Sequence, residues 1–452
     1  MKATAYVCSA CGGESPKWLG RCPVCQEWNS LSEEPQSRLS ASSSLGRSAE
    51  PAPTLSLASF AEDAEISRIA TGIASLDRVL GGGLVSGMSV LIGGEPGIGK
   101  STLLLQCAWA LERSGLKVLY ASGEESGAQI ALRARRLGIL SEKLLLLTGH
   151  SVERILQAVE QDGPDILIVD SIQTIASESA QSAPGSLSQV RECAVRLLEM
   201  TKRKGTPLLL VGHVTKDGSL AGPKALEHLL DTVIYFEGDG NFTYRMLRTA
   251  KNRFGPAGEL AVFEMAERGL IAVDNPSALF LAQRKDGAAG SVVFCSLEGS
   301  LPFLVEIQAL VVGGSAGSAR RWATGFDPVR SAMLLAVLEK RAGLSLSHED
   351  VFINVAGGVR LTEPAADLAV ACAVASSLLN RPARSDTVAL GEVGLVGEVR
   401  AVSRAAERVR EAHRLGFSRC LLPQANLKDF PKDLALSAQG VRTISEAVES
   451  LL

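Results

Sequence analysis

The chain of 452 residues lacks a long apolar run, a large excess of charge and a disulfide framework. No segment approaches the roughly 18 apolar residues of a transmembrane helix, and the first residues, MKATAYVCSACGG, lack the apolar stretch of a signal peptide. We therefore expect a cytoplasmic protein with no membrane partner. The net charge is only −3, so any grip on a polyanion such as nucleic acid must come from local patches.

The nine cysteines fall into two groups, and their odd number argues against a secreted disulfide framework. Five are scattered singly through apolar stretches, where they are most simply small core residues: Cys107, Cys193, Cys295, Cys372 and Cys420.

The other four form two Cys-x2-Cys pairs near the N-terminus: Cys8, Cys11, Cys22 and Cys25. Four soft sulfur ligands on two tight turns suit tetrahedral Zn²⁺, which would fold a piece with too little core of its own. A redox pair and two disulfides are the alternatives. The ten-residue spacer is shorter than the spacer of about 15 to 20 residues in a zinc ribbon, which favours a small knuckle. Lys17, Trp18 and Arg21 lie between the pairs, where they could touch nucleic acid or a partner protein, or Trp18 could pack on the zinc site.

Composition and patterning divide the chain into four parts. Residues 1–30 form the C4 zinc-binding module, and residues 31–65, rich in Ser, Ala, Pro and Glu, read as a flexible linker. Residues 66–274 alternate apolar runs with amphipathic segments, which predicts a largely parallel sheet covered by helices. Residues 275–452 predict a second α/β domain. Its expected helices span residues 327–342, 364–380 and 403–415.

The segment GEPGIGKS, residues 94–101, fits the phosphate-binding loop pattern G-x4-G-K-[ST] and lies between a predicted strand and a predicted helix. Its glycines let backbone N–H groups surround phosphate oxygens, Lys100 reaches the β and γ phosphates, and Ser101 ligates magnesium. The predicted nucleotide-binding residues are Gly94, Glu95, Pro96, Gly97, Ile98, Gly99, Lys100, Ser101 and Thr102.

Two other predicted strands end on acidic residues. The run PDILIVD ends on Asp170, whose carboxylate could hold the magnesium shell or merely cap the next turn. The run VLYASGEES carries Glu124 and Glu125, one of which could polarise the attacking water. Neighbouring residues point in different directions, so we favour Glu124 as the base. A solvated acidic pair is the alternative.

These segments together resemble the RecA-type ATPase core. With the N-terminal cysteine pairs, the whole chain closely resembles the RadA (Sms) family of bacterial DNA repair proteins. The resemblance implies a homohexameric ring ATPase with ATP, Mg²⁺ and Zn²⁺ as cofactors. It further implies partners that are single-stranded and branched DNA, branch migration in the manner of a replicative helicase, and a role in homologous recombination. The RecA recombinase is a candidate partner.

The segment KNRFG, residues 251–255, is the one by which that family is recognised. In RecA-like rings ATP lies between subunits, so the resemblance implies that Lys251 and Arg253 reach the γ-phosphate held by the next subunit, as an arginine finger does. Residues two apart on a strand face the same side, so both cations could reach one phosphate or one DNA backbone. A solvated charge pair at a strand end is the alternative.

The resemblance also suggests DNA contacts. His213 stands where RecA-like cores place a residue that senses the γ-phosphate, and the following loop carries Lys216 and Lys224, which could face a central channel. Three arginines of the C-terminal domain could add a basic surface or be ordinary surface residues: Arg320, Arg321 and Arg330.

The region from about residue 275 onward resembles the proteolytic domain of Lon proteases. The match places Ala365, in EPAAD, at the serine nucleophile and Ala406 at the activating lysine. A methyl group can neither attack a carbonyl nor take a proton, so we expect a proteolytically inactive copy. An ATP-dependent protease and an ATP-gated ring scaffold are the alternative functions.

Overall fold

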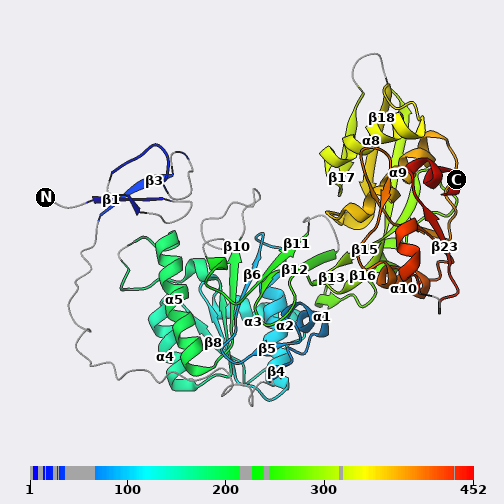
Figure 1. Ribbon diagram of the computed structural model, residues 1–452. Helices are drawn as coiled ribbons and strands as arrows, with labels where there is room; N and C mark the ends of the chain where they lie inside the picture. Colours follow the sequence, from blue (N-terminus) through cyan, green and yellow to red (C-terminus); the bar gives the residue numbers. More distant parts are fainter. Residues whose placement is uncertain are drawn as a thin grey trace, which may run out of the picture. The chain divides into compact units, whose positions relative to one another are not determined.

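The computed structural model describes residues 4–8, 14–15, 17–23, 28, 30–35, 67–180, 182–213, 226–238, 244–314, 319–431 and 433–451. The chain divides into two compact units, Met1–Ala272 and Val273–Leu452 (Figure 1). The expected boundary after residue 274 lies close to this division. None of the helices in these ranges combines the length and apolarity needed to cross a membrane.

The N-terminal module is a three-stranded antiparallel sheet in the order β2-β1-β3. Its strands are β1 (Thr4–Cys8), β2 (Glu14–Ser15) and β3 (Leu31–Pro35). β3 pairs with β1 along its whole length, from Leu31 opposite Cys8 to Pro35 opposite Thr4. The module therefore continues into the first five residues of the stretch that the composition marks as linker.

The sheet of residues 66–274 has nine strands within the described residues, in the order β14-β13-β12-β11-β6-β10-β9-β7-β8. Six parallel strands coincide with the six apolar runs of the sequence: β6 (Ser89–Gly94), β7 (Val118–Ser122), β8 (Leu145–Thr148), β9 (Ile166–Asp170), β10 (Leu208–His213) and β11 (Thr232–Glu237). Three antiparallel strands extend the sheet: β12 (Tyr244–Asn252), β13 (Leu260–Ala266) and β14 (Gly269–Ala272). This arrangement confirms the predicted largely parallel α/β fold.

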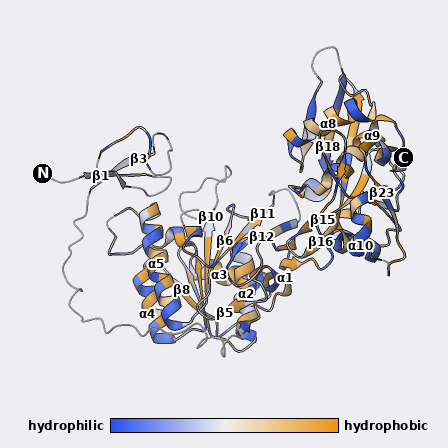
Figure 2. Ribbon diagram, viewed as in Figure 1, coloured by the Kyte–Doolittle hydropathy of each residue, from blue (hydrophilic) through white to orange (hydrophobic). Residues whose placement is uncertain are grey.

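Helices cover both faces of this sheet (Figure 1). One face holds α1 (Ala74–Leu80), α2 (Lys100–Arg113) and α3 (Gly127–Arg136), and the other holds α4 (Val152–Asp162) and α5 (Leu187–Lys204). In β6, Val90 and Ile92 join the first core, whereas Leu91 joins the second. Since both faces are buried, the central strands are apolar over most of their length, and the core of this sheet is largely orange in Figure 2. A short ribbon of β4 (Arg68–Ile69) and β5 (Leu84–Val85) lies near α1 in the sequence.

The parallel register brings the candidate site residues to one edge of the sheet. His213, the last residue of β10, pairs with Gly94, the last residue of β6. Asp170, the last residue of β9, pairs with Ser122, the last residue of β7. The carboxyl ends of parallel strands are where α/β folds bind their ligands.

The C-terminal unit has a seven-stranded sheet within the described residues, in the order β17-β18-β16-β15-β19-β22-β23. Its strands are β15 (Ser291–Glu298), β16 (Leu301–Gly313), β17 (Arg321–Thr324), β18 (Glu349–Val355), β19 (Thr387–Ala389), β22 (Arg419–Pro423) and β23 (Ser437–Val441), with a hairpin of β20 (Glu392–Val393) and β21 (Val399–Arg400). Its helices are α7 (Pro276–Leu281), α8 (Pro328–Ala342), α9 (Asp367–Leu378), α10 (Ala405–Arg414) and α11 (Ile444–Leu451).

The three helices expected in this unit correspond to α8, α9 and α10, and so are confirmed. The central helix α9 is buried from Asp367 to Ser376.

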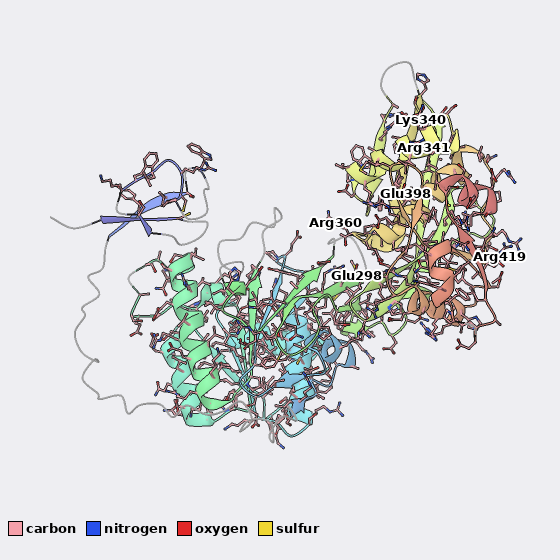
Figure 3. All side chains as sticks on the ribbon, viewed as in Figure 1. Glu298, Lys340, Arg341, Arg360, Glu398 and Arg419 are labelled. Carbon is pink, nitrogen blue, oxygen red and sulfur yellow. The ribbon has the colours of Figure 1, made fainter. Side chains whose placement is uncertain are left out.

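Figure 3 marks Glu298, at the end of β15, and Arg419, on β22, on opposite sides of the unit.

Candidate active site

The phosphate-binding loop connects β6 to α2, and Lys100 is the first residue of that helix. Gly99, which precedes it, has φ 119°, a backbone conformation that residues other than glycine rarely adopt. A Cβ added to Gly99 would lie 2.9 Å from Cε of Met265 on β13. The loop therefore packs against the β13–β14 hairpin, and this position needs a glycine for its backbone conformation.

Lys100 is buried at the mouth of this loop, with 3% of its surface exposed. Its Nζ donates to the carbonyl oxygens of Gly94 and Glu95, both at 2.8 Å, and lies 3.2 Å from Nδ1 of His213. Burial lowers the pKa of Lys100 to about 8, against the opposing effect of the carboxylates of Asp170, Glu124 and Glu95. The ammonium group is thus held by backbone carbonyls that an incoming phosphate could replace.

Asp170 ends β9 and is buried beside this lysine. Its Oδ2 accepts a hydrogen bond of 2.7 Å from the Tyr120 hydroxyl, and burial, followed by Asp170, raises the pKa of Tyr120 well above its usual range. Oδ1 of Asp170 is buried without a hydrogen-bond partner among the described residues. A carboxylate oxygen left in this state fits a Mg²⁺ ligand, with Ser101 at the start of α2 as the second protein ligand.

The two neighbouring glutamates face different partners. Glu124 accepts hydrogen bonds from the Ser171 hydroxyl and, at 2.6 Å, from Nε2 of His213. The hydrogen bond from His213 is the largest of the effects that lower the pKa of Glu124. Glu125 instead pairs with Arg133 of α3. Only Glu124 belongs to the group around Lys100 and Asp170.

His213 connects the lysine to the glutamate. A neutral imidazole protonated on Nε2 donates to Glu124 and accepts from Lys100 through Nδ1, which satisfies both contacts. The three side chains therefore form one chain of hydrogen bonds across the ends of β6, β7 and β10.

A cavity of about 660 Å³ opens beside the start of α2. It is lined by Thr102, by Arg136 and Leu137 at the end of α3, and by residues 265–269 of the β13–β14 hairpin. Its volume lies in the range of small-ligand sites, and its position next to the phosphate-binding loop suits the nucleoside part of a nucleotide. Apart from Thr102, no sequence motif marks these residues, because they come from separate elements.

The cations of KNRFG contact the segment before β11 of the same chain. Arg253 donates from its backbone N–H to the carbonyl of Asp231 at 3.0 Å, and its Nη1 lies 3.2 Å from Oδ1 of the same residue. Lys251 donates to the carbonyls of Glu227 and Leu230, both at 2.7 Å. Burial lowers the pKa of Lys251, and the nearby Arg253 charge lowers it further. The Arg253 side chain remains 50% exposed, so it can contact a group outside the subunit.

The other residues of KNRFG build the turn that presents Arg253. Asn252 accepts from the backbone N–H of Phe254 at 2.9 Å and donates to the carbonyl of Leu80 at 3.1 Å. A Cβ added to Gly255 would lie 2.8 Å from Cα of Gly81, which ends α1. The glycine allows the two backbones to come into contact.

The KNRFG cations lie at the opposite edge of the sheet from the phosphate-binding loop of the same subunit. Thr232 of β11 pairs with Val90 of β6 on one side and with Asn252 of β12 on the other. Arg253 follows Asn252, whereas the loop begins at Gly94 at the other end of β6. At about 3.3 Å per residue, the strand from Val90 to Gly94 alone separates them by about 13 Å.

The N-terminal module brings two of the four candidate zinc ligands together. Cys8 and Cys22 are buried in one small core with Leu31, and the Cys8 thiol lies 3.1 Å from the Ser30 hydroxyl. Two thiols from distant positions in so small a core fit a structural Zn²⁺ site. Four of the candidate residues lie outside the described part of the chain: Cys11, Cys25, Lys216 and Lys224.

The three candidate arginines of the C-terminal unit differ in their surroundings. Arg330 forms a two-pronged ion pair with Asp367, whose side chain is fully buried. Arg320 is exposed but pairs with the buried carboxylate of Asp350 at 2.7 Å. Arg321 is exposed on β17. Arg330 therefore has an internal structural partner, and the outward-facing positions are Arg320 and Arg321.

The positions matched to the Lon catalytic pair are close to a buried ion pair. Ala365 is buried in a single 3-10 turn, Pro364–Ala366, and Ala406 lies in the first turn of α10. Glu363, just before that turn, forms an ion pair with the buried Arg408 of α10. The ion pair joins the segment that contains Ala365 to the helix that contains Ala406.

The fold and this site define the ATPase region as a RecA-like P-loop ATPase. The family model of the AAA domain matches residues 54–219, that of the rubredoxin metal binding domain matches residues 6–33, and that of subunit ChlI of Mg-chelatase matches residues 329–426.

Proteins named DNA repair protein RadA match the chain from end to end. The one from Bacillus subtilis is 49% identical over 99% of this chain and 98% of its own length, the one from Aquifex aeolicus 50% over 99% of both chains, and the one from Pseudomonas aeruginosa 48% over 99% and 98%. The chain belongs to the RadA family of DNA repair proteins.

The rubredoxin-type match corrects one expectation about the N-terminal module. The short spacer favours a small knuckle, but the module is a zinc ribbon with an antiparallel sheet. The length of the spacer does not predict this fold. The strand β3, which pairs along all of β1, comes after the second cysteine pair and so lies outside the spacer.

Proposed function

We propose that the protein is a DNA-stimulated ATPase that assembles as a homohexameric ring and moves along single-stranded DNA. In this proposal it drives branch migration of recombination intermediates in homologous recombination and DNA repair, in the manner of a helicase. The names of its relatives, DNA repair proteins, support the setting. The partners are single-stranded and branched DNA, with the RecA recombinase as a candidate loading partner.

The observation that carries the ring proposal is the position of Arg253. It lies at the sheet edge opposite to its own phosphate-binding loop, and its side chain is half exposed. A cation in this position cannot stabilise a phosphate bound in its own subunit, but it can do so for a phosphate bound by a neighbouring copy. Supplying the charge in trans would make hydrolysis depend on how the subunits are arranged.

Within one site, each residue has a chemical task that its surroundings support. Lys100 would exchange the carbonyls of Gly94 and Glu95 for the β and γ phosphates of ATP. Glu124, kept ionised by its hydrogen bonds, would accept a proton from the attacking water. Asp170 and Ser101 would hold Mg²⁺, which neutralises phosphate charge when it is bound.

For the C-terminal unit we propose an assembly or DNA-binding role without proteolysis. Ala365 and Ala406 provide no nucleophile and no base, so the protease alternative predicts a casein-type activity that should be absent. Arg320 and Arg321 are the proposed DNA contacts of this unit, together with Lys216 and Lys224 of the ATPase region.

The test measures ATP hydrolysis with and without single-stranded DNA across a salt series. DNA should stimulate the rate, and salt should weaken the stimulation because the phosphate contacts are ionic. A rate that ignores DNA at low salt would count against the proposal. The variant Lys100→Ala distinguishes a motor from a scaffold. If the protein is a motor, the variant loses branch migration while its rings persist. If it is a scaffold, neither the wild type nor the variant shows branch migration.

A further inference from the structure

The zinc module presents two large aromatic side chains to solvent. Trp18 is 57% exposed and Trp28 is 68% exposed. Neither belongs to the small core around Cys8 and Cys22, which favours the alternative in which Trp18 contacts a partner over the one in which it packs on the zinc site. A module of this size would gain stability by burying its two indole side chains in its own core. That it exposes them indicates a binding surface.

The two indoles are neighbours. A Cβ added to Gly20 would lie 3.7 Å from the Trp28 ring and 4.0 Å from the Trp18 ring. Gly20, which has no side chain, therefore leaves the space between the two rings open.

Positive charge flanks this pair of rings. The Arg21 guanidinium lies over the Trp28 ring, 5.6 Å from its centroid, and Lys17 is exposed directly before Trp18. The apolar neighbour Leu19 is 43% exposed, less than either indole. Flat aromatic faces with adjacent cations match unpaired bases and their phosphates better than they match an apolar protein face.

We propose that the zinc module is a single-stranded DNA contact in which Trp18 and Trp28 stack on unpaired bases while Lys17 and Arg21 face the backbone. We name this pair of rings the indole platform. Stacking tolerates any base, because every base has an aromatic face. The inference rests on the proposed action on single-stranded DNA, and it adds a contact outside the ring.

The test uses the full-length protein with three variants: Trp18→Ala, Trp28→Ala and the matched control Leu19→Ala. Affinity is measured for an oligo(dT) strand and for an abasic strand of the same length and charge. Zinc content and basal ATP hydrolysis without DNA verify that each variant is folded.

The indole platform predicts that each tryptophan variant binds oligo(dT) about 5- to 150-fold more weakly, the range of stacking energies measured per base. Binding to the abasic strand should change little, and Leu19→Ala should behave as the wild type. Oligo(dT) should also quench part of the tryptophan fluorescence, and this part should be absent from the double variant Trp18→Ala, Trp28→Ala.

Other outcomes overturn the inference in distinguishable ways. If the wild type binds oligo(dT) and the tryptophan variants bind it equally well, the platform is not a DNA contact and the proposed function stands. Equal losses on both strands would assign the effect to charge or folding instead of stacking. If the wild type binds no single-stranded DNA, the inference and the proposed function both fail.

Discussion

The different partners of Glu124 and Glu125 lead to a prediction about two adjacent, chemically identical side chains. Replacing Glu124 by Gln should abolish most ATP hydrolysis, because the amide cannot accept a proton from water. Replacing Glu125 by Gln should leave hydrolysis nearly unchanged, because that carboxylate pairs with Arg133 and makes no hydrogen bond to His213 or Ser171 among the described contacts.

The structure sets the size of both effects. A positioned general base contributes about 10²- to 10⁴-fold, or about 3 to 5 kcal/mol of barrier at about 1.36 kcal/mol per tenfold. Glu124→Gln keeps the size of the side chain and an oxygen for the Ser171 hydroxyl, so ATP binding should persist. The Glu125–Arg133 pair is partly exposed, and losing such a pair costs at most about 1 kcal/mol of stability.

The assay compares steady-state hydrolysis and nucleotide affinity of the two variants, each with its ring state measured. The expected result is a kcat loss of about 10²-fold or more for Glu124→Gln with Kd for ATP within about threefold. Equal losses in both variants, or a Glu124→Gln enzyme with normal kcat, would refute the assignment of the base.

Three further predictions concern protonation, packing and zinc. Because the pKa of Lys100 is lowered to about 8, this lysine is largely deprotonated at pH 9 when no nucleotide is bound. The phosphates of ATP should restore its charge on binding. Calorimetry in buffers of different ionisation enthalpy should therefore show proton uptake on ATP binding at pH 9 and little at pH 7. Uptake that is equal at both pH values would contradict this. Gly255→Ala should lower the thermal midpoint of the ATPase region, as overpacking costs about 1 to 3 kcal/mol against Gly81, and an unchanged midpoint would disprove the contact. Cys22→Ser should release the zinc while ATP hydrolysis without DNA continues, which metal analysis and an ATPase assay together would check.

Sequence patterns predicted the ATPase sheet well, for a physical reason. Most of its parallel strands are buried on both faces, so each reads as a continuous apolar run; the outer strand β8 is partly exposed. The position of Asp170 follows directly because it ends an apolar run, and that of Lys100 follows from the phosphate-binding loop pattern that comes after another.

The features that the sequence did not predict depend on contacts between distant residues. The cavity beside Thr102 is completed by the β13–β14 hairpin, more than a hundred residues later in the chain. From the sequence alone Arg330 is an ordinary surface arginine, whereas in the structure it forms an ion pair with the buried Asp367. The partner of Glu125 likewise lies on α3, which the acidic pair alone could not reveal.

The sequence also did not predict the contacts that hold the KNRFG segment in place. The segment reads as two cations beside a glycine, but Lys251 holds the carbonyls of Glu227 and Leu230, and Asn252 shapes the turn. Only Arg253 is left half exposed. The structure thus separates one outward-facing cation from its supporting residues.

The most direct test of the shared site mixes two inactive proteins. Arg253→Ala subunits keep an intact phosphate-binding loop, and Lys100→Ala subunits keep an intact Arg253. In randomly mixed rings about one quarter of the interfaces would combine the two intact halves, so hydrolysis should recover to roughly that fraction of the wild-type rate. If mixed rings, verified by mass, hydrolyse no more ATP than the two variants separately, the site is not completed by a neighbouring subunit.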